Sequence, residues 1–155
     1  MKICAVDYDH PDAIALRHDL QQFYVERYGG PDNAPVDPSE FRPPRGASFV
    51  GYLDGRPVAS GSWHSVDVNR FETTKVAEIK RVHVAPNLRR RGLARQILAE
   101  LENTAREANH EAVVLSTGLR QPEAIALYEG SGYTSIEGFG HWAHDNLVVF
   151  LGKRL

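Results

Sequence analysis

A run of arginines stands where the sequence predicts the start of a helix. The stretch NLRRRGLARQIL (87–98) contains an apolar stripe with helical spacing that opens at Leu93. Four arginines surround the first turn of this helix: Arg89, Arg90, Arg91 and Arg95. Because a first turn has unpaired N–H groups and a partial positive charge, each nearby cation destabilises it by roughly 0.3 kcal/mol or more. The arrangement therefore requires either a compensating charge or a fully solvated helix end.

A bound anion would supply the compensating charge. Gly92 and Ala94 are small and would let a phosphate approach the free N–H groups of the first turn. A pyrophosphate bound there would pair with the arginines as well as with the helix dipole. The alternative is a basic, solvated helix end, and the charges alone leave both interpretations open. Two familiar phosphate-binding motifs are absent, because the chain contains neither GxxxxGK[ST] nor GxGxxG.

The elements around this turn follow from hydrophobic periodicity and from turn residues. Residues 75–86 predict a long strand ended by Pro86, and the arginine-flanked helix that follows has Asn109 as its expected C-cap. Three further elements complete this half: a buried strand at 112–117, a short helix within 121–133 with Pro122 near its start and Gly130 or Gly132 at its end, and a last strand within 145–155.

The first half of the chain predicts a strand, a helix and a hairpin. Residues 2–6 form the strand, and Asp9 or His10, followed by Pro11, opens a helix that stops at Gly29-Gly30. A Pro- and Gly-rich connection covers 29–46, and residues 47–66 alternate around the hairpin signal Asp54-Gly55. The resulting order, β-α-loop-β-β-β-α-β-α-β, indicates an α/β sandwich with at least one parallel pair of strands.

Composition limits the class of protein. The 155 residues fit a single domain, with 42% hydrophobic and 25% charged residues. One cysteine excludes an intrachain disulfide and a thiolate zinc site, and we expect no metal. A net charge of −2 argues against bulk attraction to nucleic acid or to anionic lipid, so a third interpretation, nucleic-acid binding by the arginine run, is weak. Without a signal-peptide pattern or a membrane-spanning run, we expect a cytoplasmic protein.

The motifs, taken in order, resemble the GNAT family of acyl-CoA-dependent N-acetyltransferases. The family signature Arg/Gln-x-x-Gly-x-Gly/Ala matches residues 89–94, which follow the strand AEIKRVHVAP. The strand VVLST and the helix AIALYEGSGY (124–133) match the second half of the family pattern. The resemblance covers residues 47–155 well, and the N-terminal strand and helix fit in order only. It implies one GNAT domain over 1–155, with a mixed central sheet of about six to seven strands flanked by helices on both faces.

The resemblance also implies how acetyl-CoA binds. Main-chain N–H groups of residues 90–95 would hold the pyrophosphate, with Arg89 opening the loop, and the pantetheine arm would lie along the strand before it. The implied cofactor-binding residues are Val82, His83, Val84, Arg89, Arg90, Arg91, Gly92, Leu93, Ala94, Arg95, Gln121 and Tyr128. The family often has an asparagine at the start of the short helix, where this chain has Gln121-Pro122, and either Gln121 or Ser116 would have to replace it.

Three residues are implied in catalysis. The N–H of Val84 would stabilise the developing oxyanion, Glu78 would remove a proton from the amine, and Tyr128 would protonate the departing thiolate. The alternative for Glu78 is an exposed strand residue paired with Lys80 or Arg81. The alternative for Tyr128, an aromatic that packs the short helix on the sheet, is compatible with catalysis.

The acceptor side is the least informative part of the sequence. Residues 29–46 would form an acceptor lid whose Asp32, Asp37 and Glu40 attract a cationic amine, or else a plain solvated loop. His141 and His144 form HxxH, but without a third ligand such a pair is more often a surface feature than a metal site. His64 and His83 lie on strands and could face the acceptor pocket, although a structural role is more common for such histidines.

The predicted function is transfer of an acetyl group from acetyl-CoA to a primary amine by direct attack in a ternary complex. The alternative is a non-catalytic acyl-CoA-binding regulatory module with the same fold. The identity of the small-molecule or peptide amine stays open, as does the oligomeric state, for which a homodimer is one option.

Overall fold

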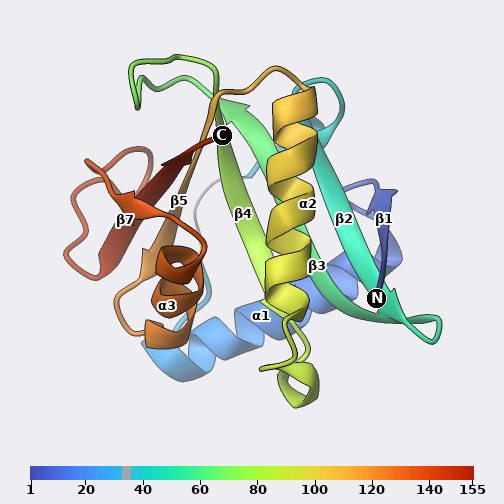
Figure 1. The fold of residues 1–155 in the computed structure, drawn as a ribbon. Coiled ribbons are helices and arrows are strands. Elements are labelled where there is room, and N and C mark those ends of the chain that lie inside the picture. The colour runs from blue at the N-terminus through green and yellow to red at the C-terminus, as the bar shows by residue number, and fades with distance from the viewer. Residues whose placement is uncertain (33–35) are drawn as a thin grey trace.

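In residues 1–32 and 36–155, which the computed structural model describes, seven strands form one mixed sheet (Figure 1). The elements in chain order are β1 (Lys2–Val6), α1 (Pro11–Tyr28), η1 (Pro38–Phe41), β2 (Gly46–Leu53), β3 (Arg56–Val66), β4 (Val76–Val84), η2 (Pro86–Leu88), α2 (Leu93–Glu107), β5 (Ala112–Gly118), α3 (Pro122–Gly130), β6 (Thr134–Ser135) and β7 (Val148–Arg154). The order across the sheet is β1-β2-β3-β4-β5-β7-β6. The predicted mixed sheet flanked by helices is thereby confirmed.

One pair of strands, at the centre of the sheet, is parallel. β4 and β5 are parallel and are connected through α2, whereas the neighbouring pairs are antiparallel. The parallel pairing covers only Val76–Glu78 of β4 against Ala112–Val114 of β5. Beyond Glu78 the two strands separate, so the rest of β4 presents an edge that β5 does not pair.

A turn and a bulge shape β2, β3 and β4. Asp54 and Gly55 have φ values of 50° and 75°, the left-handed geometry that a two-residue hairpin turn requires. In the next pair, Ser60 lies opposite His83 and Ser62 opposite Lys80, so β4 has one extra residue opposite Gly61. Arg81 in this bulge has a φ of 60°, which is unusual for a residue with a side chain.

The main core lies between the sheet and α2. Ile97, Leu98 and Leu101 on α2 are at most 1% exposed and pack with Trp63 of β3 and Ile79 of β4. Figure 1 shows α2 and α3 in front of the sheet and α1 behind it. A smaller cluster under α1 joins its Ala13 and Leu16 to Val50 of β2. Because Phe49 belongs to the main core and Val50 to the cluster under α1, adjacent residues of β2 serve opposite faces.

The structure corrects the sequence interpretation at several element ends. α2 ends with Ala108 as its C-cap, so the predicted cap, Asn109, is the next residue and has a φ of 69°. The last strand begins at Val148 rather than near 145, and the short helix covers Pro122–Gly130 only. The two-residue strand β6 was not predicted, since Thr134–Ser135 is too short for a periodic pattern.

Candidate active site

The turn before α2 leaves backbone N–H groups and cations without acidic partners. Gly92 is the N-cap of α2 with a φ of 78°, no side chain caps the helix, and its first turn has no acidic residue. Arg90 has a φ of 63°, and left-handed residues in such turns let successive N–H groups point to one side. Within residues 1–32 and 36–155, the structure shows no ion pair to the four arginines around this turn. This part of the chain can therefore hold an anion supplied from outside.

A cavity of about 620 Å³ opens next to this turn. It lies between α1, the end of β4, the start of α2 and α3. Eleven of the twelve residues implied in cofactor binding line it: Val82, His83, Val84, Arg89, Arg90, Gly92, Leu93, Ala94, Arg95, Gln121 and Tyr128. The remaining one, Arg91, has an exposed side chain outside the cavity wall. Sequence reasoning missed the contribution of α1, namely Leu20, Phe23 and Arg27.

The free edge of β4 forms part of the cavity wall. Ala85 donates its N–H to the carbonyl of Val58 at 2.8 Å, on the β3 side. Because successive residues of a strand point their polar backbone groups to opposite sides, the backbone of Val84 faces away from β3, toward the gap between β4 and β5. Arg89 Nε donates to the Val84 carbonyl at 3.3 Å, which agrees with this orientation. An extended ligand can add to this edge in the manner of another strand.

Tyr128 and His83 are the buried titratable groups of the cavity. Tyr128 is 8% exposed and packs against Tyr133, with ring centroids 5.6 Å apart, and burial raises its pKa. Burial, followed by the charge of Arg89, lowers the pKa of His83 to about 4. His83 Nε2 has no hydrogen-bond partner in the described part of the chain. Both side chains are therefore neutral near pH 7.

Glu78 lies where β4 and β5 separate, and it is buried rather than exposed. Its residue exposure is 9%, and its Oε1 accepts a hydrogen bond from His64 Nε2 at 2.8 Å. Lys80 Nζ lies 3.8 Å from the other carboxylate oxygen. The alternative of an exposed strand residue is therefore wrong, although the pairing with Lys80 that it included is present.

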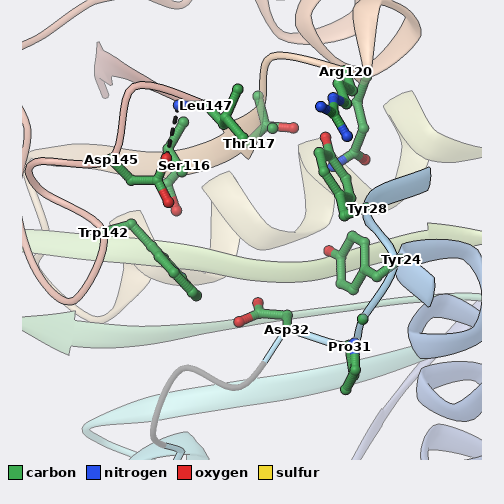
Figure 2. Close-up of a pocket in the computed structure, with 14 residues that line it drawn as sticks. Tyr24, Tyr28, Pro31, Asp32, Ser116, Thr117, Arg120, Trp142, Asp145 and Leu147 are labelled. Atoms are coloured by element: carbon green, nitrogen blue, oxygen red, sulfur yellow. Dashed lines mark hydrogen bonds between the residues drawn. The ribbon is translucent and has the colours of Figure 1, made fainter. Parts of the chain in front are cut away.

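Two smaller cavities open beside Glu78 and the end of β5. One, of about 120 Å³, is lined by Glu78, His64, Lys80 and Glu40 among others. The other, of about 240 Å³, lies between the end of α1, the end of β5 and the 142–148 segment (Figure 2). Ser116 and Trp142 line both of these cavities. Gln121 lines both the second of them and the large cavity, so it lies between the two compartments.

The acidic residues of the predicted acceptor segment differ in their surroundings. Asp32 lines the cavity of Figure 2 and forms an ion pair with Arg81 at 2.8 Å. Asp37 caps η1 by accepting from the N–H and the hydroxyl of Ser39. Glu40 lies beside His64, 3.2 Å from its Nδ1. Residues 33–35 of this segment lie outside the described residues.

The predicted HxxH pair contributes one residue to these cavities. His141 lines the cavity of about 120 Å³ beside Glu78 and packs edge-on against Trp142, at 4.5 Å between ring centroids. In the described ranges, no group of three or more His, Cys, Asp or Glu residues is arranged to hold a metal ion. Of the helices described, none is long and apolar enough to cross a membrane.

Comparison with known proteins identifies the class of protein to which this fold belongs. The model of the Acetyltransferase (GNAT) family matches residues 13–133. The chain therefore belongs to the GNAT acetyltransferase family, whose members use acetyl-CoA as co-substrate.

Individual relatives resemble the chain over nearly its whole length. An IAA acetyltransferase of Azospirillum brasilense is 28% identical over 142 residues, which is 92% of this chain and 90% of the relative. A Klebsiella pneumoniae structure assigned as an acyl-CoA N-acyltransferase matches with a TM-score of 0.80 and 27% identity, over 99% of this chain and 97% of that one. A GNAT family acetyltransferase of Elizabethkingia anophelis with acetyl-CoA bound shares the fold, with a TM-score of 0.69 and 14% identity over 99% and 97% of the two chains.

Proposed function

We propose that residues 1–155 form one acetyltransferase domain that transfers the acetyl group of acetyl-CoA to a primary amine by direct attack in a ternary complex. The observation that carries the proposal is the large cavity, which joins Arg89, Arg90 and Arg95 to a strand edge that β5 does not pair. In the described part of the chain, none of these three arginines forms an ion pair. The pyrophosphate of acetyl-CoA fits the N–H groups and cations of residues 89–95. Its pantetheine arm fits the edge at Val82 and Val84, which carries polar backbone groups in the spacing of a neighbouring strand.

The catalytic roles follow from the positions of three groups. The main-chain N–H of Val84 lies at the gap between the strands, where it would donate to the thioester oxygen as negative charge develops. Glu78, at the point where the strands separate, takes a proton from the amine, because only a neutral amine has a lone pair for attack. Since burial keeps Tyr128 protonated, its phenol can donate a hydrogen bond to the departing thiolate.

The acceptor amine would enter from the opposite side. The two smaller cavities contain the carboxylates of Glu78, Asp32 and Glu40 together with the cations Lys80 and Arg120, whereas the large cavity contains arginines of the turn before α2. Gln121 borders both compartments and would contact either substrate. The carboxylates of the smaller cavities suit a cationic amine, and the arginines of the large cavity suit an anionic donor.

Acetyl-CoA binding tests the donor half of the proposal. Arg90→Glu places a carboxylate at the anion site, and Arg56→Glu makes the same charge change at the exposed start of β3. Isothermal titration should show an acetyl-CoA affinity that falls at least about tenfold in Arg90→Glu and is unchanged in Arg56→Glu. Equal affinities in the two variants would contradict the assigned site.

Acetyl transfer tests the catalytic half. A panel of primary amines is incubated with acetyl-CoA, and free thiol is followed with a colorimetric reagent for wild type, Glu78→Gln and Tyr128→Phe. The proposal expects thiol release with at least one amine and slower release in both variants. Tight binding of acetyl-CoA without thiol release for any amine would favour the non-catalytic binding module instead.

A further inference from the structure

His64 stands between two carboxylates that come from different parts of the chain. Its Nε2 donates to Glu78 Oε1 at 2.8 Å, and its Nδ1 lies 3.2 Å from Glu40 Oε2. When the imidazole is protonated, the second contact is close enough for an ion pair, although it is not aligned as a hydrogen bond. The side chains of His64 and Glu78 are each 12% exposed, whereas that of Glu40 is 38% exposed.

The register of the sheet fixes the relative position of His64 and Glu78. His64 and Glu78 lie directly opposite each other in the antiparallel pairing of β3 and β4, so their side chains project from the same face. The pair sits at the last position where β4 is paired with β5. The imidazole therefore orients a carboxylate located at the opening of the gap between these strands.

Gly46 allows Glu40, the carboxylate near His64 Nδ1, to lie in this position. Gly46 of β2 lies directly opposite His64 in the sheet. A Cβ atom at Gly46 would lie 2.3 Å from the carbonyl oxygen of Glu40, 2.7 Å from Cα of Phe41 and 2.7 Å from the carbonyl oxygen of Trp63, so η1 rests directly on the backbone of the sheet. Any larger residue at this position would displace η1, and with it Glu40, or the backbone of β3 at Trp63.

Aromatic packing limits rotation of the imidazole. Phe41 is 2% exposed and packs against the His64 ring, with centroids 5.0 Å apart. The ring of Tyr8 stacks on that of Phe41, with centroids 4.4 Å apart. His64 is thus held by packing as well as by charge, and its two nitrogens have fixed directions.

From this geometry we propose that His64 is a positioning residue that holds the Glu78 carboxylate in its reactive orientation and links it to the acceptor-side segment through Glu40. The inference rests on the proposed function, because it assigns His64 to the base of that reaction. In that reaction, Glu78 accepts one proton from the amine. The Nε2–H of His64 keeps Oε1 of Glu78 in place and leaves Oε2 for the amine. Lys80, near that second oxygen, compensates the charge but comes from the same strand and does not orient the carboxylate toward the acceptor segment.

The test compares two substitutions of His64 that fill similar space. His64→Gln keeps an N–H donor for Glu78, and His64→Leu keeps only packing. The expected kcat falls roughly 10- to 100-fold in His64→Leu, as for a misplaced general base, and is mostly recovered in His64→Gln. The acetyl-CoA affinity should be unchanged in both variants, because His64 does not line the large cavity. His18→Gln, on an exposed face of α1, is the matched control with unchanged kcat.

A second pair of variants keeps the inference testable if His64→Leu fails to fold. Glu40→Gln, at a half-exposed side chain, should fold normally and lower kcat about two- to threefold, the loss expected when one weak ion pair is removed. Gly46→Ala should lower kcat further by displacing η1, again without changing the affinity for acetyl-CoA.

The outcomes separate the two proposals. An active wild type with equal kcat in His64→Leu, or with equal losses in His64→Leu and His64→Gln, overturns the positioning role alone. Unchanged kcat in both Glu40→Gln and Gly46→Ala overturns the link to the acceptor segment. A wild type that releases no thiol with any amine overturns the proposed function together with the role of His64.

Discussion

Gly61 is the position where the fold leaves least room beneath α2. It lies on β3 opposite the β4 bulge, and a Cβ atom there would approach Ile97 Cγ2 to 2.7 Å and Leu101 Cδ1 to 2.9 Å. Both of these side chains are 0% exposed, so neither can move into solvent. The substitution Gly61→Ala must therefore shift α2 away from the sheet or force a core side chain out of its preferred rotamer.

Two opposing effects determine how much Gly61→Ala lowers the free energy of unfolding. Overpacking by one methyl group costs about 1–3 kcal/mol, and the smaller conformational freedom of alanine in the unfolded chain returns roughly 0.4–1 kcal/mol. The free energy of unfolding should therefore fall by about 1–2 kcal/mol, which lowers Tm by roughly 2–8 °C for a chain of this size. Because α2 carries the arginine turn at its N-terminus, acetyl-CoA affinity should fall as well.

Urea unfolding followed by tryptophan fluorescence measures this change, since Trp63 is 2% exposed in the same core. Gly30→Ala is the matched control, because a Cβ atom at Gly30 meets nothing within 4 Å and its backbone is not left-handed. That variant should be as stable as wild type or slightly more stable. If Gly61→Ala is as stable as Gly30→Ala, α2 does not pack on β3 as tightly as we infer.

Three further measurements probe the site and its support. Tyr128→Phe should fold normally, because its ring packing remains, and lose roughly 10- to 100-fold in kcat with little change in the KM for acetyl-CoA; an unchanged kcat would remove the phenol from the mechanism. With the pKa of His83 lowered from 6.5 to about 4, the unfolded chain binds a proton between these pH values that the folded chain does not. The free energy of unfolding should therefore fall from pH 7 to pH 5 by an amount on the order of 1–2 kcal/mol that is missing in His83→Asn, and identical pH dependence in the two proteins would refute this. Lys153→Met removes the ammonium group 2.8 Å from the buried Glu102, which keeps the hydrogen bond from the Tyr133 hydroxyl, and should cost about 1–3 kcal/mol, partly regained in Glu102→Leu/Lys153→Met; a single variant as stable as wild type would show that the pair contributes nothing.

The sequence was informative where one local signal determines the backbone. Asp54-Gly55 predicted the hairpin because few residue types adopt two successive positive φ angles. Gly29 ends α1 in the left-handed conformation for the same reason. The arginine turn could be recognised because its charges contradict the helix dipole, and the structure places most of the residues implied by that motif around one cavity.

Features that depend on distant contacts could not be predicted in this way. The bulge at Arg81 has no local signature, since arginine rarely adopts positive φ and the ion pair with Asp32 forms only in the folded chain. The sequence left open an exposed strand residue as the alternative for Glu78, because its partner, His64, belongs to another strand. The proximity of Glu40 to His64 depends on Gly46, whose role as a seat for η1 is visible only when the two segments are packed together.

The most direct test of the central claim is a titration of isotopically labelled protein with acetyl-CoA, followed through the backbone amide resonances. We expect the largest shifts at the amides of residues 90–95 and at Val82 and Val84, and much smaller shifts for the hairpin turn at Asp54-Gly55. Shifts confined to residues outside the large cavity, or none at saturating acetyl-CoA, would contradict the assignment of this turn and strand edge as the donor site.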